Sequence, residues 1–271
     1  MSGAVKRQAY YHLSAMETNT DKDEYRRFAL AFALAMAFCG GLTELYSARI
    51  RGTYAAMMTG NTISMFIAFA DGQYRAGWFG LAVIATFFLT CLVAEIVLLV
   101  AKRKGLEPHP WLLLVQALCF LPALLVPINQ TVKGYLYIRE ATGLDLLANC
   151  FLAVYGAIQL VAFIDLQGTS YPTTMMTKNT KTAIAEFVTG LADKSKSRLV
   201  RSFELSAIIV FFFMGVVSFY LALSFGPAGI ARFAPLVPLA ITMVLFAFSF
   251  RVYRRKPITA SLSQANKAFR P

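Results

Sequence analysis

Long apolar runs, each able to cross a lipid bilayer as a helix, constrain this chain more than any other feature. The hydrocarbon core of a bilayer is about 30 Å thick, and crossing it takes about 20 residues of α-helix. Six runs meet or approach that length: Phe28–Tyr46, Trp78–Val100, Trp111–Ile128, Leu146–Ile164, Ser206–Phe225 and Phe233–Phe250. The sequence therefore predicts an all-α, polytopic helical membrane protein.

Composition excludes the other broad classes of protein. Apolar residues make up 58% of the 271 positions and charged residues 15%, whereas a soluble domain is about 45–50% apolar and about 25% charged. The four cysteines stand singly inside apolar runs, so neither a metal site nor a disulfide framework is expected. The chain lacks the common hydrolase, metalloprotease and phosphate-loop motifs. We therefore expect neither an enzyme nor a bound cofactor.

Two further stretches, Thr53–Ala70 and Pro172–Thr189, are apolar at their ends but polar at their centres. The second contains Lys178 and Lys181, and a lysine at the centre of a membrane helix costs about 2.5–3.5 kcal/mol. Irregular backbone at membrane depth is tolerated where protein shields it or where it lines a wet cavity. We therefore predict six spans plus two short broken or re-entrant segments, the first of which breaks at Gly60.

The two short stretches resemble each other at a constant offset of 118 residues. Residues 56–62 read AMMTGNT and residues 174–180 read TMMTKNT, with five of seven positions identical. The predicted organisation is a two-fold internal repeat, with tails and a linker outside it: 1–27 tail, 28–130 first repeat, 131–144 linker, 145–250 second repeat and 251–271 basic tail. The halves are inverted if the short segments do not span, and parallel if they do.

The distribution of Lys and Arg predicts the orientation. With six spans, 18 of these residues lie on the side of the two tails and 6 on the other side. Because cytoplasmic loops are enriched in positive charge, both termini are expected in the cytoplasm. The eight-span model gives the same split, so the charge rule does not choose between the two models. The net charge of +12 is assigned to loops and a C-terminal tail that contact anionic lipid, not to nucleic-acid binding.

Polar side chains expected at membrane depth are the candidate solute site. They are Thr59, Gly60, Asn61, Thr62, Glu44, Gln159, Thr177, Lys178, Asn179 and Thr180. Broken helices paired across a repeat axis expose half-helix ends to anions and freed carbonyls to cations. The competing interpretation is helix packing, because small and hydroxyl residues also occupy helix–helix interfaces.

Two of these residues have more than one interpretation. Glu44 either faces the same cavity as Asn61 or pairs with Arg49 or Arg51 at the membrane surface. Lys178 stands where the first copy has Gly60. It either binds an anionic substrate, pairs with Glu44 or Glu186, or extends to the interface.

These motifs resemble the YoaK-like bacterial membrane proteins, catalogued as a domain of unknown function (DUF1275). In the first half the resemblance rests on Gly40-Gly41, Glu44 and Met58-Thr59-Gly60-Asn61. In the second half it rests on Gly156, Gln159 and the run from Thr173 to Thr177. The chain departs from the family pattern at Glu44, where aspartate is usual, and at Lys178, which replaces a glycine. The resemblance implies a bacterial inner-membrane protein and carries no established function.

Two functions remain in competition. The first is a secondary transporter or channel for a small solute or ion, with its site at the paired broken segments. The second is a non-transporting membrane scaffold or accessory subunit that packs against a partner or against a second copy, so a homo-oligomer stays open. A transport assay on Asn61→Ala and Thr59→Val variants discriminates between them.

Overall fold

The computed structural model describes residues 26–127, 142–163, 165–166, 169–170, 173, 176–226 and 230–253. Nearly all of the predicted 1–27 tail, most of the 131–144 linker and the 251–271 tail after residue 253 lie outside these residues. The first described helix covers 26–46 and continues into a π-helical turn, η1 (Ser47–Arg51). The later elements are α2 (Met58–Ala70), α3 (Tyr74–Lys104), α4 (His109–Leu118), α5 (Phe120–Leu125), α6 (Gly143–Ala162), β1 (Asp165–Leu166), β2 (Thr169–Ser170), α7 (Met176–Ala192), α8 (Lys196–Phe225), η2 (Ile230–Phe233) and α9 (Leu236–Tyr253).

The described part of the chain is helical, apart from one minimal hairpin. The two-residue strands β1 and β2 pair antiparallel after α6. Five described helices are long and apolar enough to cross a membrane: Arg26–Arg51, Tyr74–Lys104, Gly143–Ala162, Lys196–Phe225 and Ile230–Ser249. The prediction of a multi-pass helical membrane protein is therefore confirmed.

The predicted run Trp111–Ile128 forms a shorter apolar helix, so the count of six spans is not confirmed. Its helical part, His109–Leu125, is 17 residues long, or about 25 Å at 1.5 Å per residue. It is interrupted at Cys119, between α4 and α5. Pro122 lies one turn beyond Leu118 and has no N–H to donate to it, which accounts for the interruption.

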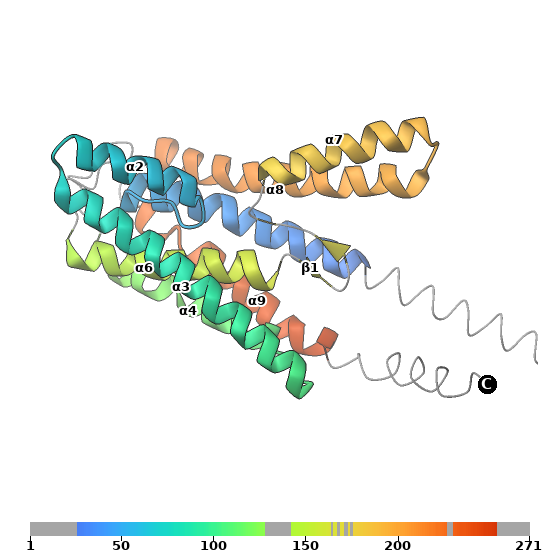
Figure 1. The fold of residues 1–271 in the computed structure, drawn as a ribbon, viewed down its shortest axis with the longest axis horizontal. Helices are drawn as coiled ribbons and strands as arrows, with labels where there is room; N and C mark the ends of the chain where they lie inside the picture. Colours follow the sequence, from blue (N-terminus) through green and yellow to red (C-terminus); the bar gives the residue numbers. More distant parts are fainter. Residues whose placement is uncertain are drawn as a thin grey trace, which may run out of the picture.

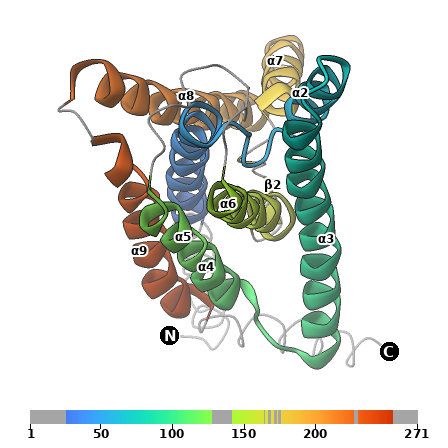
Figure 2. The ribbon, with the colours of Figure 1, turned by 90° about the vertical axis from the view of Figure 1, so that its left-hand side faces the viewer.

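The first helix and α6 form the centre of the bundle. Seen along the long axis, both lie inside a ring made by α8, α9, α4 with α5, α3, and the pair α2 and α7 (Figure 2). The contacts α3–α6, α4–α6 and α5–α6 connect that ring to the centre, and α4 packs against α9 within the ring. Helices α3 and α8, by contrast, leave many large apolar side chains exposed, as lipid-facing helices do.

The two short helices run in opposite directions along the long axis. In Figure 1, α2 starts near the middle of the molecule and runs to the left end, whereas α7 starts near the middle and runs to the right end. Each then turns and packs against the helix that follows it, α2 on α3 and α7 on α8. Seen along the axis in Figure 2, the two short helices occupy the same side of the bundle.

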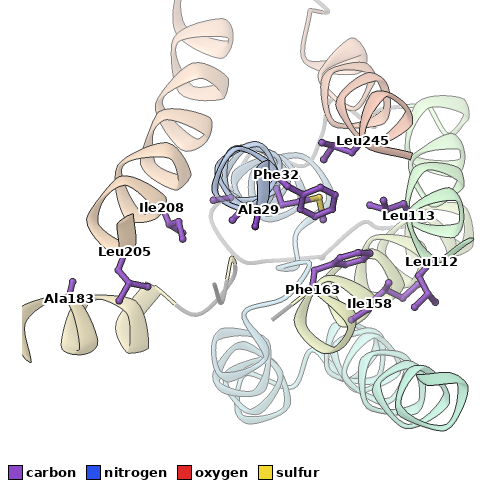
Figure 3. Packing of buried hydrophobic residues seen from close by; sticks show 14 residues of the cluster. Ala29, Phe32, Leu112, Leu113, Ile158, Phe163, Ala183, Leu205, Ile208 and Leu245 are labelled. Atoms are coloured by element: carbon purple, nitrogen blue, oxygen red, sulfur yellow. The ribbon is translucent and has the colours of Figure 1, made fainter. Parts of the chain in front are cut away.

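Apolar residues from almost every helix surround the N-terminal half of the first helix. Figure 3 shows Phe32 facing Leu245 of α9, Leu113 of α4 and Phe163 at the end of α6. In a soluble protein, burying such a side chain stabilises the fold by about 1.5–3 kcal/mol relative to leaving it exposed to water. In a bilayer the gain comes instead from tight packing of the helices against one another.

Glycine brings the first helix and α8 into backbone contact. A Cβ atom at Gly41 would lie 1.9 Å from the carbonyl oxygen of Phe212, and one at Gly215 would lie 2.1 Å from the carbonyl oxygen of Phe38. No larger residue fits at either position unless the helices separate. Close approach through small residues is how membrane helices gain packing energy without a hydrophobic driving force.

Arg51 connects the two halves of the chain at the end opposite the described termini. Its side chain is completely buried and pairs with Asp145 at 2.9 Å. The guanidinium has five N–H donors, and each of them donates a hydrogen bond. The acceptors are the Asp145 carboxylate, the Tyr46 hydroxyl and the backbone carbonyls of Ala123, Val126 and Pro127. Asp145 also completes a capping box with Thr142 at the start of α6.

Removing the buried charge should destabilise the protein strongly. We expect Arg51→Met to cost about 3–5 kcal/mol, because Asp145 is left buried without a counter-charge. Arg49, two residues earlier, is exposed, so Arg49→Met should leave stability unchanged. The melting temperatures of both variants after detergent extraction measure the difference. Equal melting temperatures would show that the Arg51 network does not hold the halves together.

Candidate functional site

A non-helical segment, residues 52–57, turns back from the end of the first helix and leads into α2. Gly52 adopts a left-handed conformation with φ of 81°, which ends the π-helical turn. Asn61 then holds the segment from within α2. Its Oδ1 accepts from the Tyr54 N–H and its Nδ2 donates to the Tyr54 carbonyl, both at 2.8 Å. The Asn61 side chain is buried and supplies the hydrogen bonds that a helix or strand would otherwise provide.

The helix does not break at Gly60, so that part of the prediction is wrong. α2 passes through Gly60 without interruption, and the irregular backbone lies before Met58. Gly60 serves packing instead, because a Cβ there would lie 2.9 Å from the ring of Tyr54. Thr62 and Ser64 bond back to carbonyls of their own helix, while Thr59 is exposed.

Glu44 faces the same non-helical segment from the first helix. Its Oε1 accepts a hydrogen bond of 2.6 Å from the backbone N–H of Ala56, and the amides of Ala55 and Met57 also lie beside the carboxylate. Gly156 of α6 makes room for the segment on its other side, since a Cβ there would lie 2.7 Å from the Ala55 carbonyl oxygen. The carboxylate is thus placed at the entry to α2, where the helix dipole favours negative charge.

The alternative in which Glu44 pairs with Arg49 or Arg51 is wrong. Arg51 is committed to Asp145, and the described residues contain no ion pair for Glu44 or Arg49. Asp145 was not among the predicted site residues. Its sequence signal is the spacing Thr142-x-x-Asp145, a capping-box pattern at the start of an apolar run.

In the second half, Gln159 of α6 occupies a role similar to that of Glu44. Its Nε2 donates to the Met36 carbonyl of the first helix at 2.8 Å and to the Thr173 hydroxyl at 3.0 Å. Thr173 precedes α7, just as Ala56 precedes α2. Asn179, three residues into α7, is fully buried, as is its counterpart Asn61.

The remaining predicted residues of the second half face outward. Thr177, Lys178 and Thr180 are exposed, and the Thr180 hydroxyl bonds to the Met176 carbonyl. Lys178 forms no ion pair with any described residue. Glu186, its predicted partner, instead lies 3.6 Å from Arg198 of α8. α7 runs from Met176 to Ala192 and passes through Lys178 unbroken.

Several buried polar atoms around the central helices have no hydrogen-bond partner among the described residues. Three lie at the Glu44 level: Glu44 Oε2, Thr43 Oγ1 and the Tyr155 hydroxyl. Three are amide oxygens, of Gln116, Asn149 and Gln159. Buried polar groups in proteins normally have a partner, either protein or water. Of these six residues the sequence analysis identified Glu44 and Gln159. The sequence signal that could have identified Tyr155 is its position one helical turn before Gln159.

The structure therefore groups the predicted residues in two places. Glu44 and Asn61 hold the 52–57 segment before α2, and Gln159 holds Thr173 before α7. The groups meet through the central helices, where a Cβ at Gly40 would lie 3.4 Å from Gln159 Nε2. Among the residues that the structure describes, no three His, Cys, Asp or Glu side chains are close enough to hold a metal ion.

The family model of a protein of unknown function, DUF1275, matches residues 32–248. The chain belongs to this family, and the resemblance to YoaK-like proteins is confirmed. No curated protein and no solved structure matches the chain. The family carries no assigned function, so function has to be argued from the geometry.

Asn61 should be essential for the stability of the 52–57 segment. Asn61→Leu has a similar shape but leaves the N–H and C=O of Tyr54 unpaired, which costs about 1–3 kcal/mol for each group. Thr62→Val removes only a hydroxyl that bonds back within its helix and should cost much less. Thermal unfolding of the two purified variants tests this prediction. A Thr62→Val variant as unstable as Asn61→Leu would contradict it.

Proposed function

We propose that this protein is a secondary transporter or channel for a small solute or ion, built from two inverted copies of one helical unit. The first copy comprises the first helix, α2, α3 and α4 with α5. The second comprises α6, α7, α8 and η2 with α9. The site lies where the non-helical segments lead into α2 and α7, inside the bilayer.

The matched starts of the two short helices support the repeat. α2 begins at Met58 and α7 at Met176, which is the offset of the AMMTGNT and TMMTKNT motifs. Thr62 and Thr180 bond to the carbonyls of these two methionines with the same distance, 2.9 Å. The opposite directions of α2 and α7 in Figure 1 support an inverted relation. Inverted repeats with discontinuous helices at the midplane are a common transporter architecture.

The charge distribution supports the orientation that this model needs. Exposed basic residues gather at the right end of the molecule in Figure 1, on the last turn of α3 and at the start of α8. The left end carries fewer: Arg49, Arg75 and Arg232. On the positive-inside rule the right end, with both described termini, faces the cytoplasm. Re-entry of α2 and α7 from opposite sides then follows from their directions.

Buried oxygen atoms without a hydrogen-bond partner support a polar interior. They lie near Glu44 and near Gln159, and the described chain gives neither group a partner. In a pure packing interface such atoms are costly, whereas a solute or water can satisfy them in a transport path. These buried oxygens without a partner among the described residues are the observation on which this proposal rests most.

The proposal can be tested without knowing the substrate by measuring whether water reaches the first turns of α2 and α7. In a variant without the four native cysteines, we expect Thr59→Cys and Thr177→Cys to react with a small, membrane-impermeant thiol reagent. Leu89→Cys on the apolar face of α3 should not react, because lipid surrounds it. If Thr59→Cys and Thr177→Cys are as unreactive as Leu89→Cys, the segments do not line a wet path.

Transport itself can be measured on the purified protein in proteoliposomes. Currents on a solid-supported membrane, recorded with a panel of amino acids, nucleobases, sugars and inorganic ions, should identify a solute that moves. Thr59→Val keeps the shape of the exposed side chain and should lower that current several-fold with folding intact. Currents that never exceed those of empty vesicles, together with a stoichiometric partner on purification, would favour the scaffold instead.

A further inference from the structure

Three polar atoms gather between the first helix and α6 without a hydrogen bond from the described chain. They are Glu44 Oε2, Thr43 Oγ1 and the Tyr155 hydroxyl, on residues that are 6%, 1% and 1% exposed. The Tyr155 hydroxyl lies beside that of Thr43 and within electrostatic reach of Glu44. The other oxygen of Glu44 is already held by the Ala56 N–H. Oε2 of Glu44 therefore lies in a buried cluster of polar atoms, and no cation among the described residues lies beside it.

Among the residues that the structure describes, none beside Glu44 supplies a positive charge. Its own helix contributes Cys39, and α6 contributes Tyr155. The 52–57 segment adds only Tyr54 as an ionisable residue. α8 is apolar where it packs against this helix, at Phe212, Val216 and Phe219. α4 and α5 contribute Cys119 and Phe120 to the neighbouring core cluster.

The number of oxygens favours a proton over a metal ion. The cluster offers two hydroxyls and one free carboxylate oxygen, while Ca²⁺ and Mg²⁺ take six or more oxygen ligands. A buried carboxylate without a counter-charge is costly, and uptake of a proton removes that cost. The hydroxyls of Thr43 and Tyr155 can then accept from the protonated carboxyl group.

We propose that Glu44 binds and releases one proton in each transport cycle, so that solute movement is coupled to protons. This inference rests on the proposed transport function. The binding step is a protonation: the carboxylate and a proton give the carboxylic acid, with the proton on Oε2, and release is the reverse. Tyr155 and Thr43 position that proton and receive its hydrogen bond.

Protonation would change how firmly the non-helical segment is held. A carboxylate forms a charge-assisted hydrogen bond with the Ala56 N–H, about twice as strong as one between neutral groups. The neutral acid weakens that bond and lets residues 52–57 move away from the first helix. In the second copy the residue with the similar role is Gln159, which holds Thr173 before α7 and does not titrate. The proton therefore acts on one of the two copies.

Infrared difference spectra between acidic and alkaline pH test proton binding without any substrate. On purified protein in lipid, we expect a carboxylic-acid C=O band that appears at acidic pH and moves to lower frequency in D₂O. Glu44→Gln, which keeps an acceptor for Ala56, should abolish it. Asp71→Asn, in the exposed turn after α2, should retain it. Tyr155→Phe should shift the frequency of the band, which a purely structural tyrosine would not do.

Two outcomes would overturn the inference. The first is an unchanged band in Glu44→Gln, since the proton would then lie elsewhere. The second is a band that responds to Na⁺ at constant pH and not to pH, which would make the group a cation site. If the band titrates through Glu44 but no solute from the panel moves, the transport proposal fails while proton binding at Glu44 stands. Where a solute does move, Glu44→Gln should lose acceleration by a pH gradient.

Discussion

Backbone groups inside a membrane need hydrogen-bond partners, and this requirement governs the structure around residues 52–57. The segment is neither helix nor strand, so its N–H and C=O groups have no regular partners. Asn61 supplies both bonds for Tyr54, and Glu44 accepts from Ala56. Gly156 leaves the space through which the segment passes. The polar residues of the first motif are thus needed for the fold before they are needed for any solute.

The side chains that hold the backbone are therefore also those of the proposed site. Glu44 holds backbone with one oxygen and leaves the other without a partner in the described chain. Gln159 likewise holds Met36 and Thr173 with its nitrogen while its oxygen remains unbonded. Under the proposed transport function, a change in the occupancy of such a site would move the segment, because the same side chain contacts both. Alternating access requires such a linkage between binding and backbone movement.

The centre and the periphery of the bundle have different roles. The first helix and α6 are packed on all sides and carry the buried polar residues, whereas α3 and α8 present wide apolar faces (Figure 2). Arg51 and Asp145 fasten the centre at one end, and Gly41 with Gly215 brings α8 against it.

The sequence predicts the membrane class, the positions of five long helices and the two unusual short segments, whereas the sixth predicted span, Trp111–Ile128, is a shorter helix. It placed the break at Gly60 because glycine is the residue that most easily leaves a helix. The structure places the irregular backbone before Met58, and Gly60 instead accommodates the Tyr54 ring. A ring stacked from a preceding loop has no periodic signal in sequence, so this misassignment has a physical cause.

The partners of the charged residues likewise depend on the tertiary structure and not on the local sequence. Arg51 and Asp145 are 94 positions apart, and their pairing depends on how two helices meet at one end of the bundle. Glu44 finds a backbone amide in place of an arginine because the chain turns back after Gly52. Hydrophobic length and composition alone determined that the chain crosses a membrane, since burial in lipid depends on each run by itself. Tertiary packing decided which polar atoms meet, because those contacts join residues that no local pattern relates.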